Sequence, residues 1–277
     1  MNRGDQLKWE ARWGPPAAAA AVGGILLPIL AGIFQTASLD SRPRADQTVE
    51  FLRLIDRQQG VFLTTAVIQA VGTLVLAGVL AYLFRVVKHR RPELPAAALA
   101  LGLVGPLLLA AAAVLDVFDR FDNADEFLRM GAENEKRADD LFVERSGLTL
   151  GVGLAGTLAL SFALIATSLA AMRAGVVSRF LGFIGVILGV LYIVGQVISA
   201  FAPLVIQFFW LGAMAALFLG RWPGGRGPTW ASGEPEPWPS QMEMARRREE
   251  QAQQTRVEPE EPAAPKPRRK KRRYRRQ

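Results

Sequence analysis

The sequence predicts an all-α membrane protein: a polytopic bundle of six transmembrane helices followed by a disordered C-terminal tail. Half of the 277 residues are hydrophobic, and they gather in six long apolar runs that a bilayer explains and a water-soluble core does not. Basic residues are concentrated beside alternate runs and at the C-terminus, and the net charge is +8. These two observations predict a chain that crosses the membrane repeatedly with a defined orientation.

Each apolar run is close to the length that a transmembrane helix needs. A helix rises about 1.5 Å per residue, so about 20 residues cross the roughly 30 Å hydrocarbon layer. The first run contains Pro28 and lacks a small-x-small cleavage site, so we expect an uncleaved anchor rather than a signal peptide. A tight turn at Phe201 and Ala202 predicts that the last two spans form an antiparallel hairpin. The expected spans are 15–38, 61–84, 94–118, 148–172, 180–200 and 203–220.

The basic residues also predict the orientation of the spans. They lie in the N-terminal segment 1–14, in the links 85–93 and 173–179, and in the tail 221–277. Six crossings place all four segments on one side, and the positive-inside rule makes that side the cytoplasm. We therefore expect a multi-pass protein of the plasma membrane, with a transmembrane domain at 15–220 and both termini in the cytoplasm.

The two loops expected on the opposite side, 39–60 and 119–146, carry more acidic than basic residues. Apolar residues at helical spacing predict a short amphipathic helix over 46–59 at the outer surface, with Asp46 as its N-cap. Apolar residues recur at similar spacing in the second loop. Both outer loops are therefore expected to be partly helical.

Ionisable side chains are almost absent from the predicted spans, which argues against a proton relay or an ion-coupled site. Asp116 is the one candidate, and it begins a series with Asp119 and Asp122 whose spacing could hold Ca²⁺ or Mg²⁺. Arginines lie among these acids, which favours a solvated acidic face. The remaining polar residues include four glutamines, which either line a polar cavity or bond to neighbouring helices. They are Gln35, Gln69, Gln196 and Gln207.

Small residues in the fourth and fifth spans predict close helix packing. Gly151, Gly153 and Gly156 spell GxGxxG, but no strand precedes them, so a dinucleotide site is the poorer interpretation. A small residue at every fourth position instead lets helix backbones approach closely in lipid. Homo-oligomerisation through either face is the alternative. The residues expected to pack are Gly147, Gly151, Ala155, Ala159, Ala163, Gly185 and Gly189.

The tail is rich in proline and glycine at first and strongly basic at its end. Its cations predict either an electrostatic anchor to anionic lipid, at roughly 1 kcal/mol per basic residue near the surface, or recognition of nucleic acid or an acidic protein. The anchor is favoured because the tail is already tethered to the membrane. Trp222, Trp230 and Trp238 either dock in a partner or lie in the interface. The cations are Lys266, Arg268, Arg269, Lys270, Lys271, Arg272, Arg273, Arg275 and Arg276.

The composition excludes several kinds of active site. The chain has no cysteine and one histidine, His89, which lies in a basic cluster. Histidine-ligated zinc hydrolases, Cys–His catalysis and Ser–His dyads all need residues that this pattern does not supply. We therefore expect no enzymatic activity, no cofactor and no metal.

Three short motifs near the last two spans resemble those of a known group of proteins. They read RFLGFIG at 179–185, FWLG at 209–212 and RWPGG at 221–225. In these motifs the chain resembles uncharacterised bacterial six-span membrane proteins that are grouped as domains of unknown function. The resemblance implies a compact all-helical membrane domain and brings no known activity.

The function that the sequence favours is a non-enzymatic scaffold or interaction protein whose partners are membrane lipids, with anionic lipid or an acidic protein at the basic tail. The alternative is a transporter or channel for a neutral or amphipathic small molecule, lined by the glutamines and hydroxyl groups. A bound molecule inside the bundle would favour the alternative, whereas a dry and fully packed bundle would favour the scaffold.

Overall fold

A computed structural model describes residues 2–40, 43–44, 47–129, 134–198, 201–223 and 225–238, together with Met242, Arg246 and Glu249. The chain divides into a first compact unit, Met1–Trp238, and a second unit, Pro239–Gln277. Every regular element among the described residues is a helix. The basic cluster at 266–276, and the disorder predicted for it, lie outside the described residues.

Among the described residues, four helices are long and apolar enough to cross a membrane. They are α1 (Arg3–Ser38), α3 (Gln59–Arg90), α4 (Ala96–Arg129) and α6 (Gly147–Arg173). Two further apolar helices, α7 (Arg179–Ile198) and α8 (Phe201–Phe218), are shorter. The structure therefore confirms an all-helical membrane protein, with four of the six expected spans at crossing length. The remaining helices are short: α2 (Thr48–Arg57), α5 (Glu135–Val143) and α9 (Thr229–Ser232).

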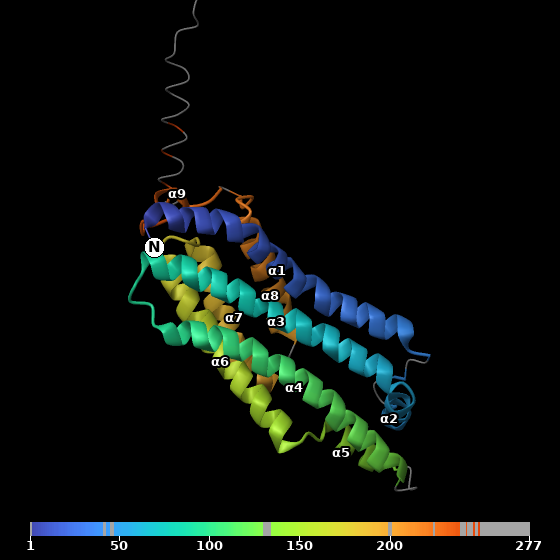
Figure 1. Ribbon diagram of the computed structural model, residues 1–277. Helices are drawn as coiled ribbons and strands as arrows, with labels where there is room; N and C mark the ends of the chain where they lie inside the picture. Colours follow the sequence, from blue (N-terminus) through green and yellow to red (C-terminus); the bar gives the residue numbers. More distant parts are fainter. Residues whose placement is uncertain are drawn as a thin grey trace, which may run out of the picture. The chain divides into compact units, whose positions relative to one another are not determined.

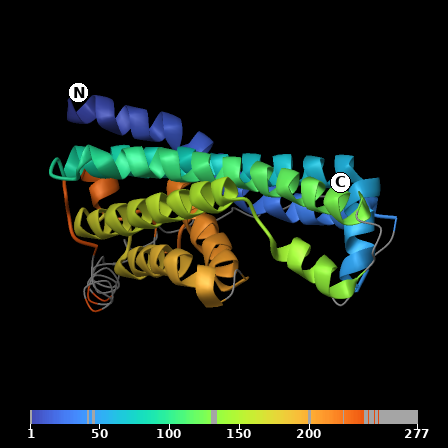
Figure 2. The ribbon, with the colours of Figure 1, turned by 90° about the horizontal axis from the view of Figure 1, so that it is seen from below.

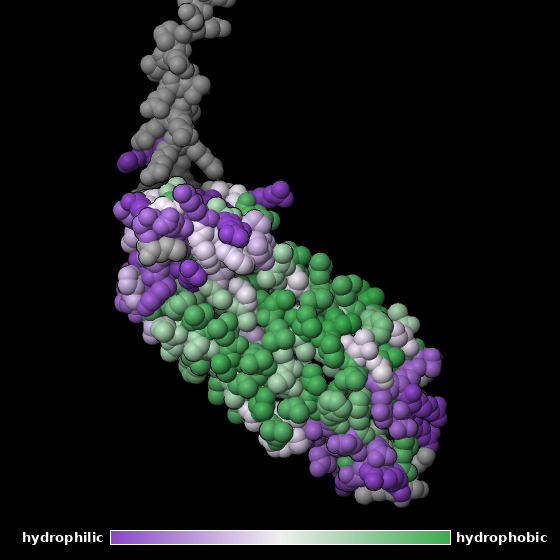
Figure 3. Space-filling model, viewed as in Figure 1, coloured by the Kyte–Doolittle hydropathy of each residue, from purple (hydrophilic) through white to green (hydrophobic). Residues whose placement is uncertain are grey.

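The six apolar helices of the first unit pack as a ring. α3 lies between α1 and α4, α6 packs on α4, α7 packs on α6, and α8 closes the ring by contacting both α7 and α1. The helices run side by side, and α2 and α5 lie at the opposite end of the unit from the N-terminus (Figures 1 and 2). Figure 3 shows, on the face it presents, a belt of hydrophobic residues between two hydrophilic ends.

Four segments that are distant in sequence meet at one end of the ring, which we call the basic end. Arg90 at the end of α3 bonds both Glu10 of α1 and Thr229, which follows α8. The indole of Trp230 donates to the carbonyl of Val176 in the turn between α6 and α7. The N-terminal segment, the end of α3, the α6–α7 turn and the segment after α8 therefore share one end of the first unit.

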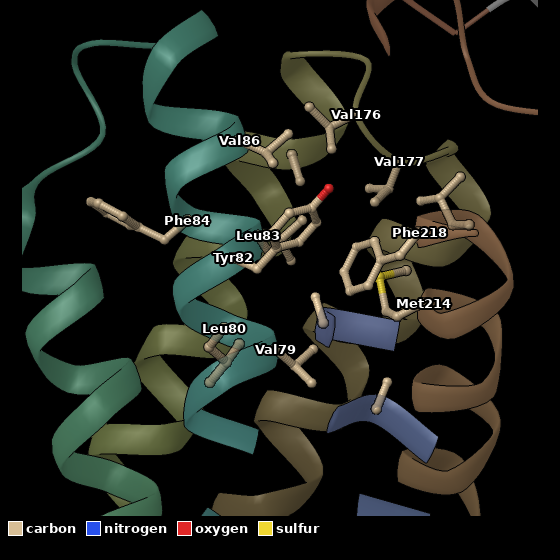
Figure 4. Packing of buried hydrophobic residues seen from close by; sticks show 14 of the residues in the cluster. Val79, Leu80, Tyr82, Leu83, Phe84, Val86, Val176, Val177, Met214 and Phe218 are labelled. Atoms are coloured by element: carbon tan, nitrogen blue, oxygen red, sulfur yellow. The ribbon is translucent and has the colours of Figure 1, made fainter. Parts of the chain in front are cut away.

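The main hydrophobic core extends to the basic end. Tyr82 of α3 packs edge-on against Phe218 of α8, with ring centroids 4.8 Å apart. Figure 4 shows these two rings facing each other, with Val176 and Val177 of the α6–α7 turn beside them. Side chains from α1, α3, α6, α7 and α8 thus meet in one cluster.

Glycines in the left-handed conformation end two of the helices at this end. Gly175 follows α6 with φ +70° and Gly220 follows α8 with φ +72°. After α8 the amide of Arg221 bonds the carbonyl of Ala216 at 2.7 Å, the 6→1 bond of a Schellman motif. Both turns therefore need residues without a Cβ.

Helix α1 bends in its first half (Figure 1), and Pro15 and Pro16 lie inside this helix. Proline has no amide hydrogen and its ring clashes with the preceding turn, so two prolines inside a helix bend it. We call residues 3–14 the N-terminal arm. Asn2 caps the arm by accepting a hydrogen bond from the amide of Asp5 at 2.8 Å.

The end of the first unit opposite the basic end is covered by a smaller layer of helices, α2 and α5. Leu52 and Ile55 of α2 are buried against α4 and α5, so α2 is part of a second core and does not lie free on the surface. Its N-cap is Gln47, which makes no side-chain cap bond, and Asp46 lies outside the described residues. Asp116 forms ion pairs with both Arg120 and Arg145.

Helices α4 and α6 approach each other closely at two glycines. A Cβ added at Gly105 would lie 2.6 Å from the backbone nitrogen of Leu160, and one added at Gly156 would lie 2.9 Å from that of Leu109. The crossing point therefore depends on two glycines, of which Gly105 was not anticipated.

The predicted series of small residues is only partly at this contact. Ala159 and Ala163 are buried, whereas Gly147, Gly151 and Ala155 are exposed, and nothing lies within 4 Å of a Cβ added at either glycine. Four residues advance a helix by about 400°, so the series drifts by about 40° round α6 at each step, and its first three members lie away from the contact. Gly185 and Gly189 lie where α7 meets α6, close to Ser168 and Ile165.

Replacing Gly105 by alanine should lower the thermal stability of the protein in detergent, because the new methyl group collides with backbone atoms of α6 that cannot rotate away. Gly151→Ala is the matched control, since its methyl group enters open space and alanine favours a helix interior by up to about 1 kcal/mol. Thermal unfolding followed by circular dichroism compares the two variants. Equal melting temperatures would show that the α4–α6 crossing does not depend on Gly105.

Candidate functional site

A groove of about 830 Å³ lies near the basic end of the first unit. α1 and α4 form its walls and α3 its floor, because α3 lies between them. The groove therefore runs along three helices that the sequence predicts to be in the membrane. Its lining residues are Gln6, Trp9, Trp13, Pro16, Ala17, Ala20, Gly78, Ala81, Tyr82, Phe84, Arg85, Lys88, His89, Pro92, Leu99 and Leu103.

The two ends of the groove differ in chemistry. The part within the apolar belt is lined by small and aliphatic side chains, among them Ala20, Gly78 and Leu103. The part at the basic end contributes Arg85 and Lys88, and none of the described lining residues is acidic. The groove thus has an apolar body and a cationic mouth, as expected for a site that holds an amphipathic anion.

Contacts at the mouth hold the cations in place. The guanidinium of Arg85 lies 4.4 Å from the ring centre of Trp9, a cation–π contact. Trp9 in turn stacks on Tyr82 with ring centroids 5.5 Å apart. The ammonium of Lys88 donates to the carbonyls of Pro92 and Leu94 at 2.5 and 2.6 Å, which ties it to the link between α3 and α4.

The length of the groove matches one leaflet of a bilayer. Gly78 and Lys88, near the two ends of its floor, are separated by ten residues of helix α3. Ten residues rise about 15 Å, which is half of the roughly 30 Å hydrocarbon layer. An acyl chain in the groove would therefore lie along α3 with its headgroup at the cations.

A buried ion pair lies beside the groove. The side chains of Arg90 and Glu10 are 0% and 3% exposed, and their two hydrogen bonds measure 2.5 and 3.0 Å. Arg90 also donates to the hydroxyl and carbonyl of Thr229 and to the carbonyl of Val86. Gln6 donates to the same carboxylate at 2.9 Å. All three nitrogens of this guanidinium thus donate hydrogen bonds, as a buried charge requires.

The C-terminal segment, residues 221–223 and 225–238, packs on the basic end. Trp230 is buried in the main core, and Trp222 and Trp238 pack against it. Arg226 donates to the carbonyl of Leu217 at 3.1 Å and lies 5.0 Å from the ring centre of Trp230. The compact unit therefore extends to Trp238.

This differs from the expectation in two respects. The boundary between domain and tail, expected after Gly220, lies after Trp238. The tryptophans, expected to dock in a partner or in the membrane interface, pack within the chain itself. Aromatic side chains account for both differences, because they bury more apolar surface than a proline-rich composition alone indicates.

The structure does not gather the predicted glutamines around one cavity. Gln69 is exposed on α3, and Gln35 is half-buried on α1. Gln207 is buried in α8 and accepts a hydrogen bond from the hydroxyl of Tyr192. The side chain of Gln196 lies outside the described atoms. Gln207 therefore bonds to a neighbouring helix and does not share a polar cavity with Gln35 or Gln69.

A comparison with known families assigns the chain. A family model described as "Domain of unknown function (DUF4386)" matches residues 21–223. The chain belongs to this family. No curated protein and no solved structure matches it. The resemblance to a family of unknown function is thus confirmed.

The match divides the groove between two parts of the chain. Within the DUF4386 match lie α3 and α4, which supply the floor and one wall of the groove, whereas the α1 residues that line the groove all precede residue 21. The N-terminal arm, with Trp9 and Trp13, and most of the C-terminal segment lie outside the matched residues. The buried pair joins the two parts, because Arg90 lies inside the match and Glu10 outside it.

Replacing Arg90 by methionine should destabilise the protein by about 3–5 kcal/mol, because it leaves the Glu10 carboxylate buried without its partner. Arg91→Met is the matched control. The side chain of Arg91 is 33% exposed and pairs with an exposed glutamate, a contact worth about 0–1 kcal/mol. Chemical denaturation in detergent measures both variants. Similar losses would show that the buried pair contributes no more than a surface pair.

Proposed function

We propose that this DUF4386 protein is a non-enzymatic, multi-pass membrane protein that binds an anionic lipid of the cytoplasmic leaflet in the groove between α1, α3 and α4. The observation that carries the proposal is an apolar channel about one leaflet deep that ends at a cationic mouth. A lipid has this same polarity, with apolar chains below a charged headgroup.

The chemistry of the mouth favours an anion over a neutral headgroup. Arg85 and Lys88 place two positive charges at one end of the groove, and His89 lies beside them. Cations near the membrane surface attract anionic lipid by about 1 kcal/mol each. The attraction is greater where part of the site is shielded from water, as it is for the half-buried Lys88.

The orientation of the protein belongs to the same proposal. Six crossings with both termini in the cytoplasm would place the mouth of the groove at the inner leaflet of the plasma membrane. In its support, Arg3 and Glu234 form an ion pair 2.8 Å long, so the two ends of the first unit lie together. The cations at 266–276 would then contact anionic lipid or an acidic partner from the same side, as a scaffold protein would.

Binding is favoured over transport by the size of the internal cavities. The cavity that Gln207 lines inside the bundle has a volume of about 10 Å³. Such a volume holds about one water molecule. The groove itself spans only one leaflet. A transporter or channel for a small molecule, the alternative from the sequence, would need a continuous path through both leaflets.

Filling the groove should displace the lipid. Ala81→Phe places a ring in the apolar body, and we expect less lipid to remain bound when the protein is purified in mild detergent and measured by native mass spectrometry. Ala19→Phe is the matched control, because Ala19 is exposed on α1 and does not line the groove. Equal lipid retention by both variants and the unaltered protein would contradict binding at this site.

Reversing the charge of the mouth should change which lipid is bound. In Arg85→Glu we expect the preference for phosphatidylglycerol over phosphatidylcholine to disappear, because the carboxylate repels the headgroup. Arg179→Glu removes the same charge from an exposed position at the start of α7, which does not line the groove, and should keep the preference. Competition between the two lipids in nanodiscs gives the ratio directly. An unchanged ratio in Arg85→Glu would rule out headgroup recognition at the mouth.

A further inference from the structure

The N-terminal arm presents two different faces. Gln6, Glu10 and Gly14, spaced four residues apart, are buried. Trp9 and Trp13 lie on the neighbouring side and line the groove. One rigid helical segment therefore contacts both the lipid site and the interior of the basic end, and a rotation that moves one face moves the other.

A continuous chain of hydrogen bonds leads from the groove to the C-terminal segment. Gln6 lines the groove and donates to Glu10 at 2.9 Å. Glu10 accepts two bonds from Arg90, and the Nε of Arg90 donates to the hydroxyl of Thr229 at 3.0 Å. The hydroxyl of Thr229 donates onward to the carbonyl of Glu234. Each member of this chain has its position fixed by the next.

The arm and the C-terminal segment also meet at the start of the arm. Arg3 donates to the carbonyl of Ser232 and pairs with Glu234 at 2.8 Å. The C-terminal segment therefore holds the arm at two places. It contacts Arg3 directly, and it holds Glu10 through Arg90.

The arm can move as a unit because of the sequence that joins it to the rest of α1. Pro15 and Pro16 cannot donate to the carbonyls of Ala11 and Arg12, so two helical hydrogen bonds are missing at this point. A helix that lacks successive bonds bends there more easily than elsewhere. The two prolines thus form a hinge between the arm and the membrane part of α1.

We infer that the lipid groove and the C-terminal segment are energetically coupled through the N-terminal arm, so that each stabilises the other. The inference rests on the proposed function, because it concerns the regulation of that same site. When Thr229 holds Arg90, Arg90 holds Glu10, and the arm keeps Trp9 and Trp13 against the groove. When the C-terminal segment is displaced, the arm swings on its prolines and the groove loses one wall.

Coupling of this kind is reciprocal. If displacing the C-terminal segment weakens lipid binding by a given factor, then bound lipid must hold the segment in place by the same factor. A partner that pulls on the chain after Trp238 would release the lipid. The amount of lipid bound in the groove would then depend on whether a partner holds the tail.

Thr229→Val tests the inference at a residue outside the groove. The variant keeps the shape of threonine but loses the hydroxyl that Arg90 and Glu234 use. Thr229→Ser keeps the hydroxyl and is the control. Fluorescent phosphatidylglycerol is titrated into the full-length protein in phosphatidylcholine nanodiscs, and hydrogen exchange of residues 228–233 is measured with and without phosphatidylglycerol.

We expect Thr229→Val to bind phosphatidylglycerol at least about fivefold more weakly than the unaltered protein, with Thr229→Ser close to unaltered. Phosphatidylglycerol should slow the exchange of residues 228–233 in the unaltered protein and in Thr229→Ser. Unchanged affinity in a Thr229→Val variant whose segment exchanges faster would overturn the coupling alone. If the unaltered protein shows no preference for phosphatidylglycerol over phosphatidylcholine, the proposed function fails and the coupling with it.

Discussion

The arrangement of the basic end depends on one buried ion pair. A charge removed from water costs several kcal/mol unless a partner and additional hydrogen bonds compensate it. Arg90 meets this condition only when Glu10 and Thr229 are both in place, since together they supply most of its acceptors. The pair therefore fixes the rotation of the N-terminal arm and the path of the C-terminal segment at once. The rotation of the N-terminal arm in turn places the aromatic side chains of Trp9 and Trp13 in the wall of the groove.

Much of the fold could be predicted because the bilayer restricts what a chain can do. Backbone groups in lipid must be satisfied within the segment, so a long apolar run has to be a helix. This reasoning is sufficient for α3 and α4, which begin close to the predicted spans 61–84 and 94–118 and continue beyond their predicted ends, to Arg90 and Arg129. It is less sufficient for α7 and α8, which are shorter and pack as a pair beside α6 and α1. The hairpin was expected from the turn before Pro203, but hydropathy alone does not determine how far it reaches.

The parts that could not be predicted depend on contacts between distant residues. Gly105 looks like any other membrane glycine until Leu160 is found 2.6 Å from where its Cβ would be. Conversely, Gly151 belongs to the predicted series of small residues, but nothing packs against it. The spacing of small residues predicts which of them share a face of the helix, but it does not predict which helix, if any, covers that face. Glu10 is a similar case. A lone glutamate in a segment with Trp9 and Trp13 was a signal for a buried acid, but its partner is eighty residues away.

The groove and the positive-inside rule draw on the same residues for different reasons. Arg85 and Lys88 lie next to a span, where the positive-inside rule counts them, and they form the mouth of the groove because they lie on α3 between α1 and α4. Anionic lipids are concentrated in the cytoplasmic leaflet, where they give the surface its negative potential. In the orientation that we propose, the cationic mouth would therefore face the leaflet that holds the proposed ligand. The orientation and the binding site do not have to be selected separately, because each additional cation at this end favours both.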